Sequence, residues 1–120
     1  MTFEAFDVVV VPFPFTDRTT TKRRPALVLS EAKGFNNKVG HSVLAMITSA
    51  NNSDWPLDIE IADLDSAGLS SASLVRMKLF TLDNQLVIRK AGALARNDQR
   101  SVINSLRQLL HLEYGGGPTL

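Results

Sequence analysis

Short runs of β-branched and apolar residues, separated by turn-forming residues, recur along nearly the whole chain. Runs of this kind predict β-strands, and we expect six of them, at residues 7–13, 26–30, 41–50, 57–63, 73–80 and 86–94. Apolar residues take helical spacing over a long stretch only near the end of the chain, where Asp98 is the expected N-cap. Six strands followed by one helix predict a mainly β fold with minor α content, a small barrel or half-barrel.

The length of 120 residues is typical of a single domain. We expect residues 1–112 to form that domain and the glycine-rich residues 113–120 to form a flexible tail. The absence of cysteine excludes disulfides and thiolate chemistry. The sequence has neither an apolar run of about 18 residues nor a basic segment leading into an apolar one, so we expect a cytoplasmic protein without a membrane span.

Charged residues are segregated along the chain, although the net charge is only +1. The connection expected between the first two strands contains four cations: Arg18, Lys22, Arg23 and Arg24. Residues 76–100 hold six more cations, whereas residues 54–65 hold five acidic residues and no cation. A locally positive face would attract phosphate without giving the whole protein a basic field.

Arg24 is the strongest single candidate for chemistry. It precedes Pro25, which restricts its backbone to extended geometry, and a guanidinium offers phosphate a planar, permanently charged fork. A solvated arginine accounts for the local sequence equally well. Thr48 and Ser49 end the third strand, where their hydroxyls either donate to a phosphate or satisfy the strand end, and the structural role is favoured.

The remaining polar residues indicate no catalytic or metal site. His41 has no partner acid or nucleophile near it in the sequence, and His111 is expected on the last turn of the helix, where a cation is favourable. Two histidines without cysteine give no metal cluster. Asp58 and Glu60 share one face of a strand, which favours a solvated face over paired catalytic carboxylates. Trp55 is expected to be a partly buried anchor at a turn rather than a platform for a base. We therefore predict no metal and no cofactor.

Four segments together resemble the MazF/PemK-type toxins of bacterial toxin–antitoxin systems: "DVVVVPFPFTD", "KRRPALVLS", "MITSA" and "AGL…SLVRMKLFTLD". They occur in the family's order and spacing, from about residue 5 to the final helix. The resemblance implies an SH3-like β-barrel with a C-terminal helix that forms a homodimer. It also implies a metal-independent endoribonuclease of single-stranded RNA, silenced by a cognate antitoxin with an acidic, partly disordered tail.

The resemblance carries over to individual residues. It implies that Arg24 and Thr48 are catalytic and that Lys78, in the fifth strand, helps to hold RNA. The further residues that we expect to bind RNA are Lys22, Arg23 and Ser49. The sequence departs from the family in two places: Phe6 replaces the glycine that often precedes Asp7, which predicts an altered turn, and the first long loop contains no Glu or Gln.

The implied chemistry needs no protein nucleophile, because the 2′-OH of RNA attacks the adjacent phosphate and leaves 2′,3′-cyclic phosphate and 5′-OH ends. Arg24 would stabilise the charge that develops on the phosphorus oxygens. Two alternatives remain open. One is a gyrase-poisoning toxin of the same fold, which binds a protein partner through the end of its helix. The other is a non-catalytic barrel that binds nucleic acid or peptides.

A homodimer is also expected from the residues themselves. The runs at 8–11 and 42–47 are apolar on both faces, and an antiparallel barrel of this size rarely needs such residues on its outside. A second chain would cover them and would join two basic loops into one continuous groove.

Overall fold

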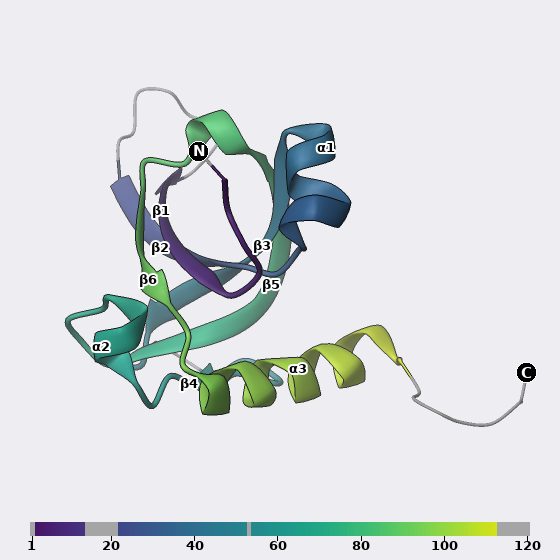
Figure 1. Ribbon diagram of the computed structural model, residues 1–120. Helices are drawn as coiled ribbons and strands as arrows, with labels where there is room; N and C mark the ends of the chain where they lie inside the picture. Colours follow the sequence, from purple (N-terminus) through teal and green to yellow (C-terminus); the bar gives the residue numbers. More distant parts are fainter. Residues whose placement is uncertain (1, 14–21, 53, 113–120) are drawn as a thin grey trace, which may run out of the picture.

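The structure, a computed structural model, describes residues 2–13, 22–52 and 54–112 (Figure 1). Over these residues the main element is a six-stranded antiparallel sheet with the order β4-β5-β3-β2-β1-β6. Its strands are β1 (Asp7–Phe13), β2 (Lys22–Val28), β3 (His41–Ser49), β4 (Ile59–Glu60), β5 (Ser73–Asp83) and β6 (Arg89–Ala93). The predicted tail at 113–120 and Arg18 of the basic loop lie outside the described residues.

Short helical segments join the strands, and one longer helix follows them. The segments are η1 (Ala32–Asn36), α1 (Asn37–Val39), α2 (Leu64–Ala67) and η2 (Asn84–Leu86), and the longer helix is α3 (Arg96–Leu110). The sheet curls into a half-barrel, and α3 lies outside it, packed against β4 and β5 (Figure 1). This arrangement confirms the mainly β fold with a C-terminal helix that the sequence predicts.

Both faces of the sheet are buried within this single chain. The helix face carries Val8 and Leu27 and packs against Val102 of α3. The barrel face carries Val9 and packs around Phe3. Val8 and Val9 are completely buried and need no second chain to cover them, whereas Val10, Val43 and Met46 of the same runs are only half-buried. The homodimer itself stays a prediction.

Strand β2 begins at Lys22, four residues before the predicted start at residue 26, so the prediction that residues 22–24 belong to a loop is wrong. These residues extend the ladder with β1, in which Val11 lies opposite Arg24. The ladder between β2 and β3 starts only at Ala26. Pro25 therefore stands where one edge of β2 is open, and this is where a strand tolerates a residue without an N–H.

The region after β3 also differs from the sequence prediction. The strand expected at 57–63 is reduced to the two residues of β4, and a helical turn, α2, occupies the expected connection. The Asp63 side chain caps α2 by accepting a hydrogen bond from Ser66 N, and Gly68 ends it at a φ of 73°. β5 continues to Asp83, through residues that were expected to form a turn.

Phe6 adopts a glycine-like conformation. Its φ is 73°, in the left-handed region that costs a side-chain-bearing residue energy. Phe6 N donates to Val28 O (2.7 Å), and Leu94 N donates to Phe6 O (3.0 Å). The residue that stands in place of a glycine is thus fixed between β2 and the segment that leads into α3.

Candidate nucleic-acid interface

The ends of β2 and β3 form the centre of the candidate site. These strands pair at only three positions, the last of which joins Ala26 and Met46. Continuing the same antiparallel register by two residues puts Arg24 opposite Thr48. Opposed residues project to the same face of a sheet, so both side chains belong to the barrel face at the point where the two strands cease to pair.

Arg24 is held by an aromatic ring from the neighbouring strand. Its guanidinium carbon lies 5.7 Å from the centroid of the Phe13 ring on β1, within the range of a cation–π contact. The residue is half-buried. Because the ring contact and the extended backbone before Pro25 both restrict the side chain, the charge is positioned in advance of any ligand.

Thr48 is half-buried, and its hydroxyl oxygen accepts a hydrogen bond from the Asn52 side-chain amide. Since this bond uses a lone pair of the oxygen, the hydroxyl proton remains able to donate to a ligand. Asn52 N also donates to Ser49 O (3.1 Å), which closes the turn after β3. Asn52 was not predicted as a site residue. The only sequence feature that could have indicated it is a pair of asparagines after a strand that ends in hydroxyl side chains.

The alternation of β2 divides the predicted basic residues between the two faces. Lys22 lies opposite Phe13 and shares the barrel face with Arg24, whereas Arg23 shares the helix face with Pro25. Ser49 is exposed and pairs with Ser73 of β5. The three cations at the start of β2 therefore lie on the two opposite faces of the sheet. The two faces meet at the edge of β2 that does not pair with β3.

A cleft of about 390 Å³ adjoins this edge. Its lining comes from β1, from the first part of β2, from β6 and from residues 68–73, and it includes Arg23, Arg24 and Arg89. Three serines and no acidic residue complete the polar part of this lining among the described residues. The cleft is therefore suited to an anion.

Lys78 lies apart from this cleft, beside the segment that follows β3. Its ammonium nitrogen is 4.9 Å from the centroid of the Trp55 ring, and the Arg76 guanidinium is 5.6 Å from the same ring. Trp55 is 40% exposed, more than the partly buried anchor that was expected. Its ring thus contacts one exposed cation, Lys78, and one largely buried cation, Arg76.

Asp58 was expected to lie on a solvated face of a strand. In the structure its side chain is instead largely buried. Its carboxylate accepts two hydrogen bonds from Arg76, at 3.1 Å from Nε and 2.9 Å from Nη2, and both side chains are largely buried. These hydrogen bonds raise the pKa of the Arg76 guanidinium above its usual value, against the opposing effect of burial. The pair fixes the segment that carries Trp55 onto β5.

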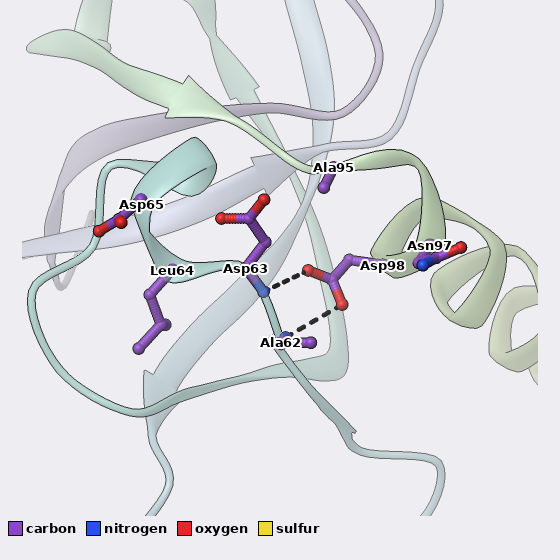
Figure 2. Close-up of a pocket in the computed structure, with 7 residues that line it drawn as sticks. All are labelled: Ala62, Asp63, Leu64, Asp65, Ala95, Asn97 and Asp98. Atoms are coloured by element: carbon purple, nitrogen blue, oxygen red, sulfur yellow. Dashed lines mark hydrogen bonds between the residues drawn. The ribbon is translucent and has the colours of Figure 1, made fainter.

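A second cleft has the opposite character. Figure 2 shows its lining at the start of α3, where the Asp98 carboxylate accepts hydrogen bonds from Ala62 N and Asp63 N, both at 3.0 Å. The N-cap of α3 is Ala95, so the prediction that Asp98 caps the helix is wrong.

Among the described residues no group of three His, Cys, Asp or Glu side chains is placed to hold a metal ion. The acidic cleft is explained by its role in attaching α3.

A curled antiparallel sheet with an arginine and a threonine at the ends of neighbouring strands, beside an arginine-lined cleft, defines a small β-barrel-like protein with a localised positively charged surface. The family described as PemK-like, MazF-like toxin of type II toxin–antitoxin system matches residues 4–110. The chain belongs to this family of toxins, as its motifs indicated. No curated protein matches the sequence significantly.

Solved structures share the fold at low sequence identity. MazF from Deinococcus radiodurans is 22% identical, with a TM-score of 0.72 over 93% of this chain and 99% of that one. An endoribonuclease in complex with its cognate antitoxin, from a mycobacterial species, is 13% identical, with a TM-score of 0.74 over 94% and 99%. The Mycobacterium tuberculosis toxin MazF-mt6 is 16% identical, with a TM-score of 0.71 over 90% and 99%. Within the described residues no helix is long and apolar enough to cross a membrane.

Proposed function

We propose that this toxin is a metal-independent endoribonuclease that cleaves single-stranded RNA, with Arg24 and Thr48 as its catalytic residues. The observation that supports the proposal is the register of β2 and β3, whose last pair is Ala26 and Met46; continued by two residues, it would put Arg24 opposite Thr48 on one face of the sheet. The protein needs no nucleophile of its own for this reaction, because RNA supplies the 2′-OH.

The reaction begins when the 2′ oxygen attacks the adjacent phosphorus and the bond from phosphorus to the 5′ oxygen breaks. The 2′-OH gives its proton to water, and the leaving 5′ oxygen takes a proton from water, so the products are a 2′,3′-cyclic phosphate and a 5′-OH. Negative charge grows on the non-bridging oxygens in the transition state. Arg24, oriented by Phe13, stabilises this charge as a preorganised cation.

Thr48 acts on the same phosphate. With its oxygen engaged by Asn52, its hydroxyl donates to a non-bridging oxygen and fixes the phosphate for in-line attack. Asn52 is then a positioning residue, because it acts on the orientation of the threonine and not on the RNA.

The residues that we propose to bind RNA around the catalytic pair are Lys22, Arg23, Ser49 and Lys78. Lys22 shares the barrel face with Arg24, and Lys78 is exposed beside Trp55. Phosphate contacts of this kind hold a strand without reading its sequence. Their cations give binding a strong dependence on salt concentration.

An antitoxin is the second proposed ligand. One of the solved relatives is an endoribonuclease in complex with its cognate antitoxin, which supports a protein inhibitor for this chain as well. We propose that an acidic, partly disordered antitoxin tail covers Lys22, Arg23 and Lys78, where its carboxylates take the place of phosphates. We also retain the homodimer as a proposal.

The test is cleavage of labelled single-stranded RNA by the purified protein in the presence of EDTA. Cleavage with 2′,3′-cyclic phosphate and 5′-OH ends is expected, and DNA of the same sequence should stay intact because it lacks the 2′-OH. A 2′-deoxynucleotide placed only at the cleaved position should block the cut there. Absence of cleavage, or dependence on an added divalent ion, would contradict the proposal.

A further inference from the structure

We propose that the cleft between the end of β2, β6 and residues 68–73 is a subsite for a second RNA phosphodiester, next to the one that is cleaved, and that Arg89 and Arg23 hold it. This inference rests on the proposed function, because it concerns the same RNA strand. Arg89 was not among the residues predicted from the sequence, and it belongs to a different strand from every one of them.

The register brings the two arginines to one face. Val10 of β1 pairs with Pro25 of β2 on one side and with Arg89 of β6 on the other, so the three residues form one row across the sheet. Arg23 stands two residues from Pro25 on the same strand and therefore projects to the same face. Both arginines are exposed and both line the cleft.

Their charges are available to a ligand. Lys90, the neighbour of Arg89, forms an ion pair with the buried Asp7 at 3.1 Å, and Arg76 pairs with Asp58. Arg23 and Arg89 form no ion pair with any of the described residues. Two guanidinium groups that have no ion-pair partner among the described residues, in a cleft whose described lining is not acidic, attract phosphate, which they can bind through paired N–H donors.

The wall opposite the arginines is fixed in place. Gly68 lies so close to β6 that a Cβ on it would stand 2.0 Å from Ala91 O, and a Cβ on Gly92 would stand 2.4 Å from Ser66 O. The Ser73 hydroxyl donates to Ser71 O (2.8 Å), which holds the segment at its other end. The serine hydroxyls of this wall are therefore presented by a backbone that packs directly on the sheet.

The position of the cleft favours an RNA strand over an acidic peptide as its occupant. Arg24 lines the cleft although its side chain belongs to the catalytic face, so the cleft begins where the scissile phosphate is bound. A strand that has one phosphate at Arg24 brings a flanking phosphate to Arg23 and Arg89. A protein tail, by contrast, can bind this surface without passing through the position of the scissile phosphate at Arg24.

The test is equilibrium binding of fluorescein-labelled, mixed-sequence single-stranded RNA, measured by anisotropy in EDTA over a range of NaCl concentrations. Thr48→Ala serves as the parent, because it prevents cleavage during the titration. Arg89→Ala is compared with Lys38→Ala, which removes one exposed cation from α1. Circular dichroism verifies that each variant is folded.

Loss of one phosphate contact on a single strand should reduce the salt slope of log K by about 0.7, which corresponds to roughly fivefold weaker binding at 0.1 M salt. We expect this change for Arg23→Ala combined with Arg89→Ala, because the two arginines hold one phosphodiester, a smaller change in slope for Arg89→Ala alone, and no change for Lys38→Ala. A parental slope for folded Arg89→Ala overturns the subsite while leaving the proposed function intact. If the parent itself fails to bind RNA, the proposed function fails and the subsite with it. If Arg89→Ala weakens binding of a polyglutamate peptide but not of RNA, the occupant is an acidic protein and the inference is wrong.

Discussion

Two glycines with nearly the same backbone conformation give a sharp test of how the cleft wall is held. Gly40 has a φ of 71° and Gly68 a φ of 73°. A Cβ at Gly40 would meet no atom within 4 Å, whereas a Cβ at Gly68 would stand 2.0 Å from Ala91 O and 2.6 Å from Ala91 C. Replacement by alanine therefore imposes the same backbone strain at both positions, but a steric clash at only one.

The magnitudes follow from this difference. The left-handed conformation costs alanine about 1–2 kcal/mol, and Gly40→Ala should lose that amount of unfolding free energy. Gly68→Ala should lose the same amount plus about 1–3 kcal/mol or more for overpacking against a backbone that cannot rotate away. At about 4–8 °C per kcal/mol for a small domain, Gly68→Ala should unfold at least several degrees below Gly40→Ala.

Urea and thermal unfolding followed by circular dichroism measure both losses. Gly34→Ala is the control, because its Cβ would meet only the flexible end of the Glu31 side chain, and its unfolding free energy should stay within about 0.5 kcal/mol of wild type. Equal losses for Gly40→Ala and Gly68→Ala would refute the reasoning. The segment after α2 would then not pack rigidly on β6, and the cleft would lack a fixed wall.

Three further results are expected. Asp98→Ala should lower the unfolding free energy by about 2–4 kcal/mol, because the backbone N–H groups of Ala62 and Asp63 lose a charged acceptor; denaturant unfolding that matches wild type would contradict this. Hydrogen bonds from the backbone and hydroxyl of Ser66 lower the pKa of Asp63, so its contribution to stability is full above the ordinary aspartate pKa and is lost as pH falls through the lower folded value. Asp63→Asn should therefore lose less stability than wild type when pH is lowered below about 4, and an unchanged acid profile would count against the cap. Sedimentation at micromolar concentration should give the mass of a dimer, and a monomer that still cleaves RNA would refute the dimer.

Much of the fold was accessible from the sequence, because the strongest strands carry their own signal. β1 and β3 are apolar on both faces, and the structure buries both faces. The start of β2 was missed because three consecutive cations look like a loop. A strand accepts them here because its edge beside β3 is open over these residues. The helical turn α2 was missed although Asp63 and Gly68, a capping residue and a left-handed glycine, bracket it.

The candidate site divides in the same way. Arg24 and Thr48 were predicted because they stand in recognisable local motifs. Asn52 and Arg89 were not, because each matters through a contact that no local pattern encodes. The place of Arg89 in one row with Val10 and Pro25 depends on the pairing of β6 with β1, two strands that are far apart in the sequence. The role of Asn52 depends on a turn that returns its side chain to Thr48.

The central claim is that Arg24 provides the charge that makes RNA cleavage possible without a metal. The most direct measurement is the single-turnover rate of cleavage in EDTA by wild type, Arg24→Ala, Arg24→Lys and Lys38→Ala, each verified as folded by circular dichroism. We expect a loss of about 10²–10³-fold for Arg24→Ala, partial recovery for Arg24→Lys because a charge without the planar fork remains, and a wild-type rate for Lys38→Ala. A folded Arg24→Ala protein that cleaves RNA at the wild-type rate would contradict the account.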